Sequence, residues 1–267
     1  MVTGAGAALE AGQGLGRAMR ILRVIASQGR RGMPFKAIAT GAQLPPSTVH
    51  RLLKALLAEG LVHKDARTAK FHLGHLLYEL GLLALPQFHL RPWCQEALDR
   101  LAALTQDTVY LSERIGLEAV ATDFRDGDYP LKALSLHVGV RRPLGVGTGG
   151  VAMLAALPPP EAEAIVRENA AYLPALGNLD EAFLLQAIAA ARQAGYAYLQ
   201  DKATRGMAAV AVAVQDRATG SLGAISVAAV PARMADGRAA QIAQALRKEA
   251  EGVEARIAAA APAGAAP

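Results

Sequence analysis

Apolar residues recur at helical spacing in three short segments of the first third of the chain, and this pattern constrains the fold more than any other feature. The first stripe begins at Leu15 and ends at Gly29, the second opens after Pro34, and the third follows the pair Pro45-Pro46. A stripe of this spacing marks the buried face of a helix. The sequence therefore predicts three short helices in succession.

Two short strands are predicted after the third helix. Ser47 or Thr48 can cap that helix, and Gly60 stops it. Residues 61–64 and 70–73 then alternate around a polar turn, which indicates a hairpin. Three helices followed by a hairpin are typical of a winged helix-turn-helix, in which the third helix enters the major groove of DNA.

The excess positive charge of the chain lies in this same region. Eleven Lys and Arg residues and four acids fall between Met1 and Leu85, a net charge of +7, whereas the rest of the chain has 17 basic and 19 acidic residues, a net charge of −2. Such an asymmetry is typical of a segment that binds a polyanion, with nucleic acid the commonest case, and equally of a basic face that is only solvated. Charge alone leaves both interpretations open.

The candidate DNA-binding residues are hydroxyls, an imidazole and cations on the predicted helices and wing. Such groups contact bases and phosphates. The third helix has one apolar and one polar face, and the wing adds further cations. The predicted set is Arg17, Lys36, Ser47, Thr48, His50, Arg51, Lys54, Lys64, Arg67 and Lys70.

The remainder of the chain predicts a second, larger domain. Alternating strands are expected over 109–114, 119–124 and 131–138, then helices, then strands over 196–200, 207–215 and 221–230, and a final helix to about residue 257. This order predicts an α+β fold with an antiparallel sheet and flanking helices. The expected division is a disordered leader (1–14), the winged helix-turn-helix (15–74), a linker helix (75–91), the second domain (92–260) and a disordered tail (261–267).

Several sequence segments resemble one known family. They are L-P-P-S-T-V-H-R-L-L-K-A-L-L-A-E-G-L-V (44–62), F-H-L-G (71–74), H-V-G-V-R-R-P-L (137–144), A-G-Y-A (194–197) and A-I-S-V (224–227). In order and spacing they are similar to the IclR family of bacterial transcription regulators. The resemblance implies a dimer or tetramer and a GAF-like C-terminal domain that binds a small organic effector.

The resemblance also implies where the effector pocket lies. It comprises Leu144, Gly145, Val146, Gly147, Thr148, Gly149, Leu199, Gln200, Asp201, Ala209 and Ser226. Several of these depart from the family pattern, because Gly147, Leu199 and Gln200 stand where a Thr and acids are usual. An apolar lining with backbone N–H donors at the glycine-rich end favours a ligand with an apolar or aromatic body and one carboxylate.

A different class of function is an alternative at the glycine run. Residues 145–150 match the dinucleotide fingerprint, which would suggest a nucleotide-dependent oxidoreductase. That motif needs a strand, a helix and a second parallel strand, but the predicted helix ends at Pro158-Pro159-Pro160 and another helix follows. We favour a loop that binds a ligand. The alternative assigns no function to the glycines, which would then only allow unusual backbone angles in this loop.

The sequence gives little support for a metal site or a hydrolase active site. The six His residues show no metal-ligand spacing, no nucleophile elbow is present, and Asp123, Asp126 and Asp128 are expected to form a solvated turn. The single Cys94 is expected to be buried helix filler. No enzyme activity, cofactor or metal is therefore predicted.

The sequence as a whole predicts a cytoplasmic, sequence-specific transcription regulator. Hydrophobic residues make up 52% and charged residues 19%, but no apolar run reaches membrane-spanning length, and no membrane partner is expected. We expect a homodimer or homotetramer, joined through the stripe Leu76, Leu77, Leu80 and Leu83, on an imperfectly palindromic operator in double-stranded DNA. Repression is favoured over activation. A DNA-binding assembly protein without an effector remains an alternative.

Overall fold

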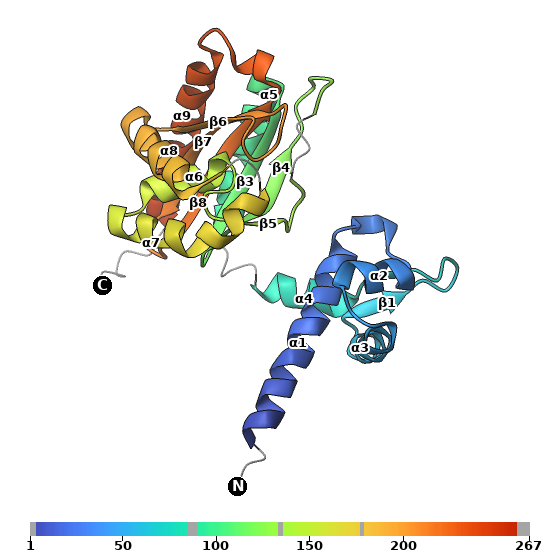
Figure 1. The fold of residues 1–267 in the computed structure, drawn as a ribbon. Coiled ribbons are helices and arrows are strands. Elements are labelled where there is room, and N and C mark those ends of the chain that lie inside the picture. Colours follow the sequence, from blue (N-terminus) through green and yellow to red (C-terminus); the bar gives the residue numbers. More distant parts are fainter. Residues whose placement is uncertain (1–3, 85–89, 133–135, 177–178, 261–267) are drawn as a thin grey trace. The chain divides into compact units, whose positions relative to one another are not determined.

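A computed structural model describes residues 4–84, 90–132, 136–176 and 179–260 (Figure 1). The chain divides into two compact units, residues 1–87 and 88–267. The first contains helices and a two-stranded hairpin, and the second contains a six-stranded sheet with helices. The predicted two-domain α+β fold, with its winged helix-turn-helix and antiparallel sheet, is confirmed.

The first unit is held together by one apolar core. Its elements are α1 (Gly4–Ala26), the short 3-10 turn η1 (Gly29–Arg31), α2 (Phe35–Ala42), α3 (Pro46–Ala58), β1 (Val62–Lys64), β2 (Phe71–Leu73) and α4 (His75–Ala84). The first three helices each bury one stripe, as their spacing predicts. The core consists of Ile21, Leu22, Ile25, Met33, Ile38, Ala42, Val49, Leu53, Leu56, Val62 and Phe71.

The first helix is longer than its apolar stripe. The sequence predicts a disordered leader over residues 1–14, but α1 already begins at Gly4. The segment before Leu15 is rich in alanine, the residue with the highest helix propensity, so the helix extends beyond the part that packs on the core. Residues 1–3 and the predicted tail, 261–267, lie outside the described residues.

The third helix begins differently from the prediction. Pro46 is its first residue and Pro45 its N-cap, with no side-chain capping hydrogen bond. Ser47 and Thr48 therefore lie inside the first turn and do not cap it. Proline suits this position because its φ is already helical and its missing N–H has no partner to lose.

Hydrogen bonds join the wing, which consists of β1, β2 and the turn between them, to the helical part and also stabilise this turn. The backbone N–H groups of Met33 and Phe71 each donate to the other residue's carbonyl, both at 2.9 Å. At the tip, Asp65 Oδ1 accepts hydrogen bonds from the backbone N–H groups of Arg67 and Thr68, both at 2.8 Å. These two hydrogen bonds hold the pKa of Asp65 below its ordinary value.

The fourth helix leaves most of its apolar surface uncovered within the first unit. None of its described residues is buried, and Leu80 and Leu83 are 50% and 76% exposed. Leu77 packs partly on the core. The sequence predicts a linker helix over 75–91, but α4 ends at Ala84. Residues 85–89 lie outside the described part, and Leu90 and Arg91 are the first residues of the next helix.

The second unit follows the predicted order of elements, apart from one strand. They are α5 (Leu90–Thr105), β3 (Thr108–Ile115), β4 (Glu118–Arg125), β5 (Arg141–Pro143), α6 (Thr148–Ala156), α7 (Pro159–Asn169), η3 (Ala170–Leu176), α8 (Glu181–Ala194), β6 (Ala197–Gln200), β7 (Ala208–Asp216), β8 (Ser221–Ala229), η4 (Pro231–Met234) and α9 (Arg238–Ala260). The sheet order is β5-β4-β3-β8-β7-β6, and each neighbouring pair is antiparallel.

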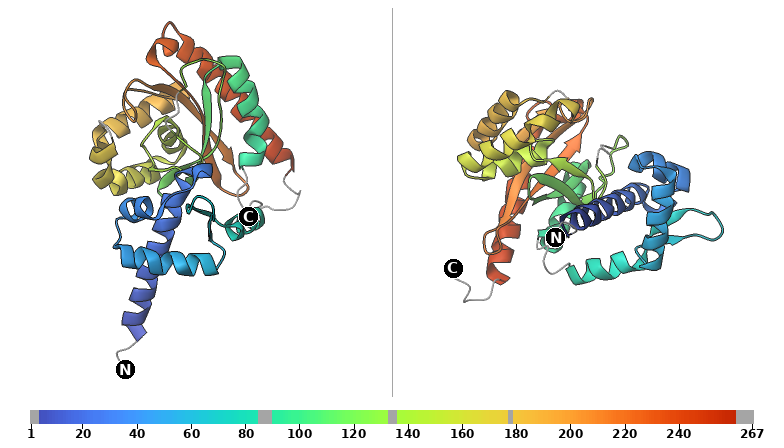
Figure 2. Two further views of the ribbon diagram at one scale, coloured as in Figure 1. Left: turned by 90° about the vertical axis from the view of Figure 1, so that its right-hand side faces the viewer. Right: turned by 60° about the horizontal axis from the view of Figure 1, so that its bottom comes forward.

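Two helical layers cover opposite faces of this sheet (Figure 2). On β7, Val210 and Val214 belong to the core shared with α5 and α9, whereas Ala211 belongs to the core shared with α6, α7 and α8. Side chains alternate between the two faces of a strand, so strands buried on both sides read as nearly continuous apolar runs. The α6 side also leaves room for a pocket.

The predicted strand over 131–138 is wrong for the residues described there. Residues 131, 132 and 136–138 are not in a strand, and the edge strand is β5, whose Arg142 pairs with Ala119 of β4. A turn at Gly139, with φ 88°, separates the two segments. Within 131–138, Leu136 lines the pocket, whereas Leu131 and Val138 are 60% and 58% exposed, so the apolar residues of this stretch do not share one buried face.

Candidate DNA-binding surface and ligand pocket

The third helix presents the two faces that a recognition helix needs. Val49, Leu53 and Leu56 are buried in the core of the first unit, while His50 and Arg51 are exposed. Ser47 and Lys54 are also exposed and Thr48 is half-buried. Leu57, expected on the apolar side, is 37% exposed. The polar face of α3 is therefore accessible along its length.

The other predicted cations lie on neighbouring elements of the same unit. Arg17 on α1 and Lys36 on α2 are exposed, as are Lys64 and Arg67 at the wing, where Lys70 is half-buried. Within the described part of this unit, one side-chain ion pair forms, between His75 and Glu79. The cations of α3 and the wing are thus not neutralised by carboxylates there, which suits a surface that meets phosphates.

Several of these side chains are steadied by short-range contacts. The Lys70 ammonium donates to the Arg31 carbonyl at 3.3 Å, and the Lys64 ammonium lies 5.5 Å from the centre of the Phe71 ring. The His50 ring packs edge-on against Phe35 with 6.4 Å between ring centres. These contacts orient the basic groups without pairing them with a carboxylate.

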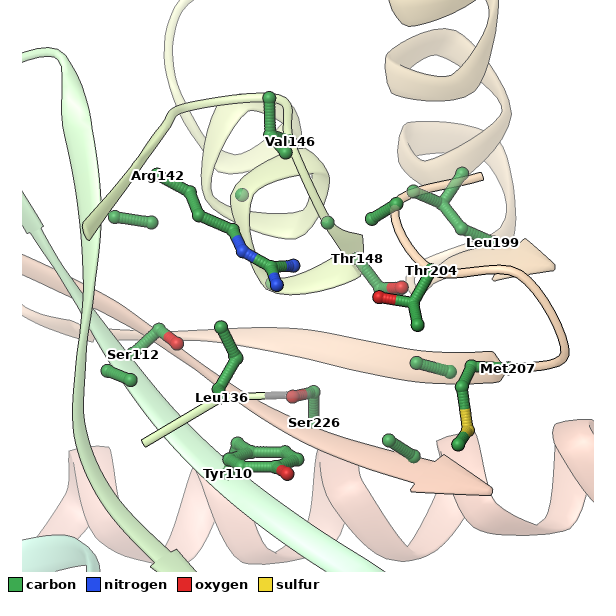
Figure 3. A pocket seen from close by; sticks show the side chains of 18 of the residues that line it. Tyr110, Ser112, Leu136, Arg142, Val146, Thr148, Leu199, Thr204, Met207 and Ser226 are labelled. Atoms are coloured by element: carbon green, nitrogen blue, oxygen red, sulfur yellow. The ribbon is translucent and has the colours of Figure 1, made fainter. Parts of the chain in front are cut away.

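The second unit contains a pocket on the sheet face that carries α6, and the space between its walls is about 720 Å³ with the adjoining open solvent included. Tyr110 and Ser226 form part of its floor on β3 and β8, and Thr148 stands at the start of α6 (Figure 3). Residues 202–204 of the β6–β7 loop close one side. Strands, a helix start and a loop distant in sequence therefore converge on one cavity.

Seven of the predicted effector residues line this pocket: Val146, Gly147, Thr148, Gly149, Leu199, Ala209 and Ser226. The other four are not among its lining. Leu144 is fully buried in the core, and a side chain at Gly145 would meet Leu184 at 2.7 Å. Gln200 and Asp201 are exposed; Gln200 accepts a hydrogen bond from Tyr198, and Asp201 accepts one from the Gly206 N–H.

Other lining residues were missed by the sequence reasoning. They include Tyr110, Ser112, Leu136, Val140, Arg142, Lys202, Thr204 and Met207. The guanidinium of Arg142 points into the cavity from β5 (Figure 3). Burial lowers the pKa of Arg142, and the electrostatic interaction with Tyr110 opposes that shift. The available signal was the H-V-G-V-R-R-P-L segment, which ends at the pocket.

The glycine run does not form the dinucleotide-binding arrangement. Gly145 and Gly147 have φ values of 100° and 97°, which only glycine adopts readily, and Gly147 is the N-cap of α6. A Cβ on Gly150 would lie 2.8 Å from the Gly145 nitrogen, so the turn needs a glycine there. In the described structure α6 leads to α7 and β5 is antiparallel to its neighbour, so the strand–helix–parallel strand unit is not formed.

No group of three or more metal-ligating side chains occurs among the described residues. None of the helices in the described ranges is both long and apolar enough to cross a membrane.

A basic winged helix-turn-helix joined to a second domain that contains a pocket is typical of one class of DNA-binding transcription regulators. The family models agree with this assignment. Residues 14–66 match the IclR helix-turn-helix domain, and residues 83–255 match the C-terminal domain of the bacterial transcriptional regulator IclR. The chain belongs to the IclR family.

Individual relatives are regulators as well. The chain is 28% identical over 204 residues to the HTH-type transcriptional regulator XynR of Escherichia coli, covering 76% of this chain and 80% of that protein. It is 30% identical to the HTH-type transcriptional regulator TtgV of Pseudomonas putida, covering 74% of this chain and 75% of that protein. The protein is therefore an HTH-type transcriptional regulator.

Solved structures share the fold. An IclR homologue from Microbacterium hydrocarbonoxydans, complexed with 4-hydroxybenzoate, aligns with a TM-score of 0.72 at 23% identity and covers 92% of this chain and all 100% of that one. The Thermotoga maritima IclR aligns with a TM-score of 0.69 at 20% identity, covering 91% of this chain and 98% of that one.

Proposed function

We propose that this protein is a cytoplasmic repressor that binds an imperfectly palindromic operator as a homodimer or homotetramer and is controlled by a small organic acid. It acts as a sensor and not as an enzyme. The proposal rests mainly on the pocket of the second unit. Among the described residues that line it are Arg142 and Lys202, and none of them is acidic. A cavity with this charge favours an anionic ligand.

The DNA-binding half of the proposal rests on the polar face of α3. The exposed groups at Ser47, His50, Arg51 and Lys54 can donate to base edges and phosphates, and the wing residues Lys64, Arg67 and Lys70 can reach the flanking backbone. Relatives include the HTH-type transcriptional repressor AllR of Salmonella typhi, 27% identical over 204 residues, which favours repression.

The effector half rests on the pocket. Gly147, the N-cap of α6, and the first helical residues Thr148 and Gly149 line the cavity, so the N-terminus of this helix adjoins it, a position that suits a carboxylate. Leu136, Leu199 and Met207 supply apolar surface for the rest of the ligand. Binding of 4-hydroxybenzoate by a structural relative is consistent with an aromatic acid here.

Footprinting tests the DNA-binding half. Full-length protein is titrated onto DNA from upstream of its own gene and of neighbouring genes, with a scrambled fragment as control. We expect one protected, imperfectly palindromic site bound at least about a thousandfold more tightly than the scrambled DNA. Equal affinity for all fragments would contradict sequence-specific regulation.

Thermal shift and calorimetry test the effector half, with a panel of aromatic acids and a panel of small hydroxy and keto acids. A ligand at about 100 times its Kd stabilises the folded state by roughly 2.7 kcal/mol. The same acid should change the affinity for the footprinted site. If no acid stabilises the protein, the assembly protein without an effector becomes the better description.

A further inference from the structure

Two histidines of the wing face each other across its strands. His63 on β1 is paired in register with His72 on β2, and their imidazole rings stack with 5.0 Å between ring centres and 13° between ring planes. Successive residues of a strand face opposite sides, and the preceding residues, Val62 and Phe71, are buried in the core. The stacked rings therefore lie on the outer face of the wing, where His63 is exposed and His72 half-buried.

Neighbouring backbone groups hold this stack in place. A Cβ on Gly32 would lie 2.3 Å from Cε1 and Nε2 of His72, so this ring occupies the space beside a glycine whose φ is 61°. Nδ1 of His63 lies 3.1 Å from the Leu73 carbonyl oxygen. Because a carbonyl can only accept, Nδ1 carries the hydrogen, and a further proton on His63 binds at Nε2.

Carboxylates are scarce around the stack. Within the wing, all of whose residues the structure describes, Asp65 is the one acid, and it already accepts the backbone hydrogen bonds of its turn. Those bonds are the main cause of its lowered pKa, and the interaction with His72 lowers it further. The other ionisable side chains described in the first unit are Lys64, Arg67 and Lys70 on the wing, Arg17, Arg20 and Arg23 on α1, Arg31 on η1, Lys36 on α2, His50, Arg51 and Lys54 on α3, Glu59 at its end, and His75, Tyr78 and Glu79 on α4. Most of these are cations, so an external anion is the partner that favours further positive charge on the wing.

The geometry favours one proton on the histidine pair over two. Imidazole is the side chain that ordinarily changes its charge between about pH 5 and 8. Two charged rings stacked at 5.0 Å would repel each other, and like charges directly opposite destabilise a strand pair. One charged ring stacked on a neutral ring avoids this repulsion. A DNA phosphate at the outer face of the wing would stabilise that single charge.

We propose that the stacked His63–His72 pair is a further part of the DNA-binding surface, which takes up one proton when a phosphate approaches the wing and so tightens DNA binding as the pH falls. The inference goes beyond the proposed function, because it rests on DNA binding by the first unit and needs neither an effector nor a particular operator. It adds two residues to the candidate surface, together with a pH dependence that lysine and arginine do not supply in this range.

DNA titrations at several pH values test the inference. Full-length protein is titrated onto a fluorescent duplex of scrambled sequence at fixed ionic strength, between about pH 5 and 8. Relative to the double variant His63→Gln/His72→Gln, the affinity of the unmodified protein should rise about three- to tenfold toward acid pH, since a phosphate favours the added proton. Its slope of log K against log salt should become steeper than that of the double variant by up to about 1, because one more phosphate is neutralised.

Two further variants assign the proton to the pair. His63→Lys places a permanent charge at an exposed position, so it should bind more tightly than the unmodified protein at about pH 8 and depend less on pH. His75→Gln is the matched control, because it removes an exposed imidazole that pairs with Glu79 on α4, and it should leave the pH dependence unchanged. His50 is present in every protein of the series, so its contribution cancels in the comparisons.

Three results would overturn the inference. One is a double variant with the same pH dependence as the unmodified protein, and another is a difference of about 2 in the salt slope, which would mean two protons. The third is an unchanged pH dependence in His63→Lys, which decides the matter if the double variant does not fold. Thermal unfolding checks the folding of each variant. Scrambled DNA has the phosphates but not the operator, so a failed footprint would contradict the proposed function and leave this inference standing.

Discussion

The guanidinium of Arg233 binds the carboxylate of Asp107 across 126 residues of sequence, with Nε 2.7 Å from Oδ1. Arg238 binds the same carboxylate, with Nη2 2.8 Å from Oδ2, and both arginines also donate to the Thr105 carbonyl. The Asp107 side chain is 1% exposed. Its hydrogen bond raises the pKa of Arg233. This cluster joins the end of α5 to η4 and the start of α9.

Replacing Asp107 by Ala should destabilise the second unit by about 2–3 kcal/mol, because two guanidinium groups lose their carboxylate. The cost is below that of breaking a fully buried pair, since both arginines can turn partly to water. Urea unfolding followed by the fluorescence of Trp93, the single Trp of the chain, reports on this unit alone. Asp99→Ala, which removes a carboxylate that is 61% exposed, is the control and should change stability by less than about 0.5 kcal/mol. Equal midpoints for the two variants would contradict the prediction.

Cys94 should be unreactive in the folded protein and should make stability fall at alkaline pH. Burial raises the pKa of its thiol to about 12. Because the folded pKa lies above the unfolded one, rising pH ionises the thiol of the unfolded chain first, and stability is lost between the two values. Thiol labelling at neutral pH in buffer and in urea, together with urea midpoints at neutral and alkaline pH, checks this. Cys94→Ala should show a smaller loss at alkaline pH, and rapid labelling in buffer would argue against the buried thiol.

The sequence predicts an element well where burial alone decides the residue pattern. The stripes of α1, α2 and α3 and the apolar runs of β7 and β8 each face a core, so their spacing identifies them. The strand predicted over 131–138 is wrong because an alternating pattern does not show that a segment finds a strand to pair with: Leu131 and Val138 are 60% and 58% exposed, and Leu136 lines the pocket.

The pocket could be predicted only in part, for a related reason. Arg142 and Ser226 lie in segments that resemble the family, but Tyr110 joins them only through the pairing of β3 with β4 and β8, which is not a local property of the sequence. Tertiary pairing also explains Asp123, expected in a solvated turn but buried, with Arg91 3.2 Å and Arg125 2.8 Å from its oxygens.

Charged substitutions on α4 should weaken self-association if its exposed stripe is the seam that the sequence predicts. Leu80 and Leu83 are 50% and 76% exposed within the chain, so Asp at both positions should leave folding intact and repel a second copy. Sedimentation at micromolar concentration should show the unmodified protein as a dimer or larger and the double variant shifted toward monomer. A Leu104→Asp variant, which changes a leucine that is 69% exposed on α5, is the control. If the unmodified protein sediments as a monomer, with and without DNA, the predicted dimer interface on α4 is wrong.

Arg51 should contribute directly to operator binding, since its side chain is exposed on α3 while Val49 and Leu53 on the same helix are buried. Arg51→Ala should cost about 1–3 kcal/mol of binding to the specific site, without a change in thermal unfolding, because a guanidinium that reads a base edge has no other side chain to replace it. If Lys54 contacts a phosphate as predicted, Lys54→Ala should weaken binding to all sequences and lower the slope of log K against log salt by about 1. Titrations at several salt concentrations on operator and scrambled DNA distinguish the two effects. Arg217→Ala, an equal loss of charge in the β7–β8 turn of the second unit, is the control. If Arg51→Ala binds the operator as tightly as the unmodified protein at physiological salt, Arg51 does not belong to the interface.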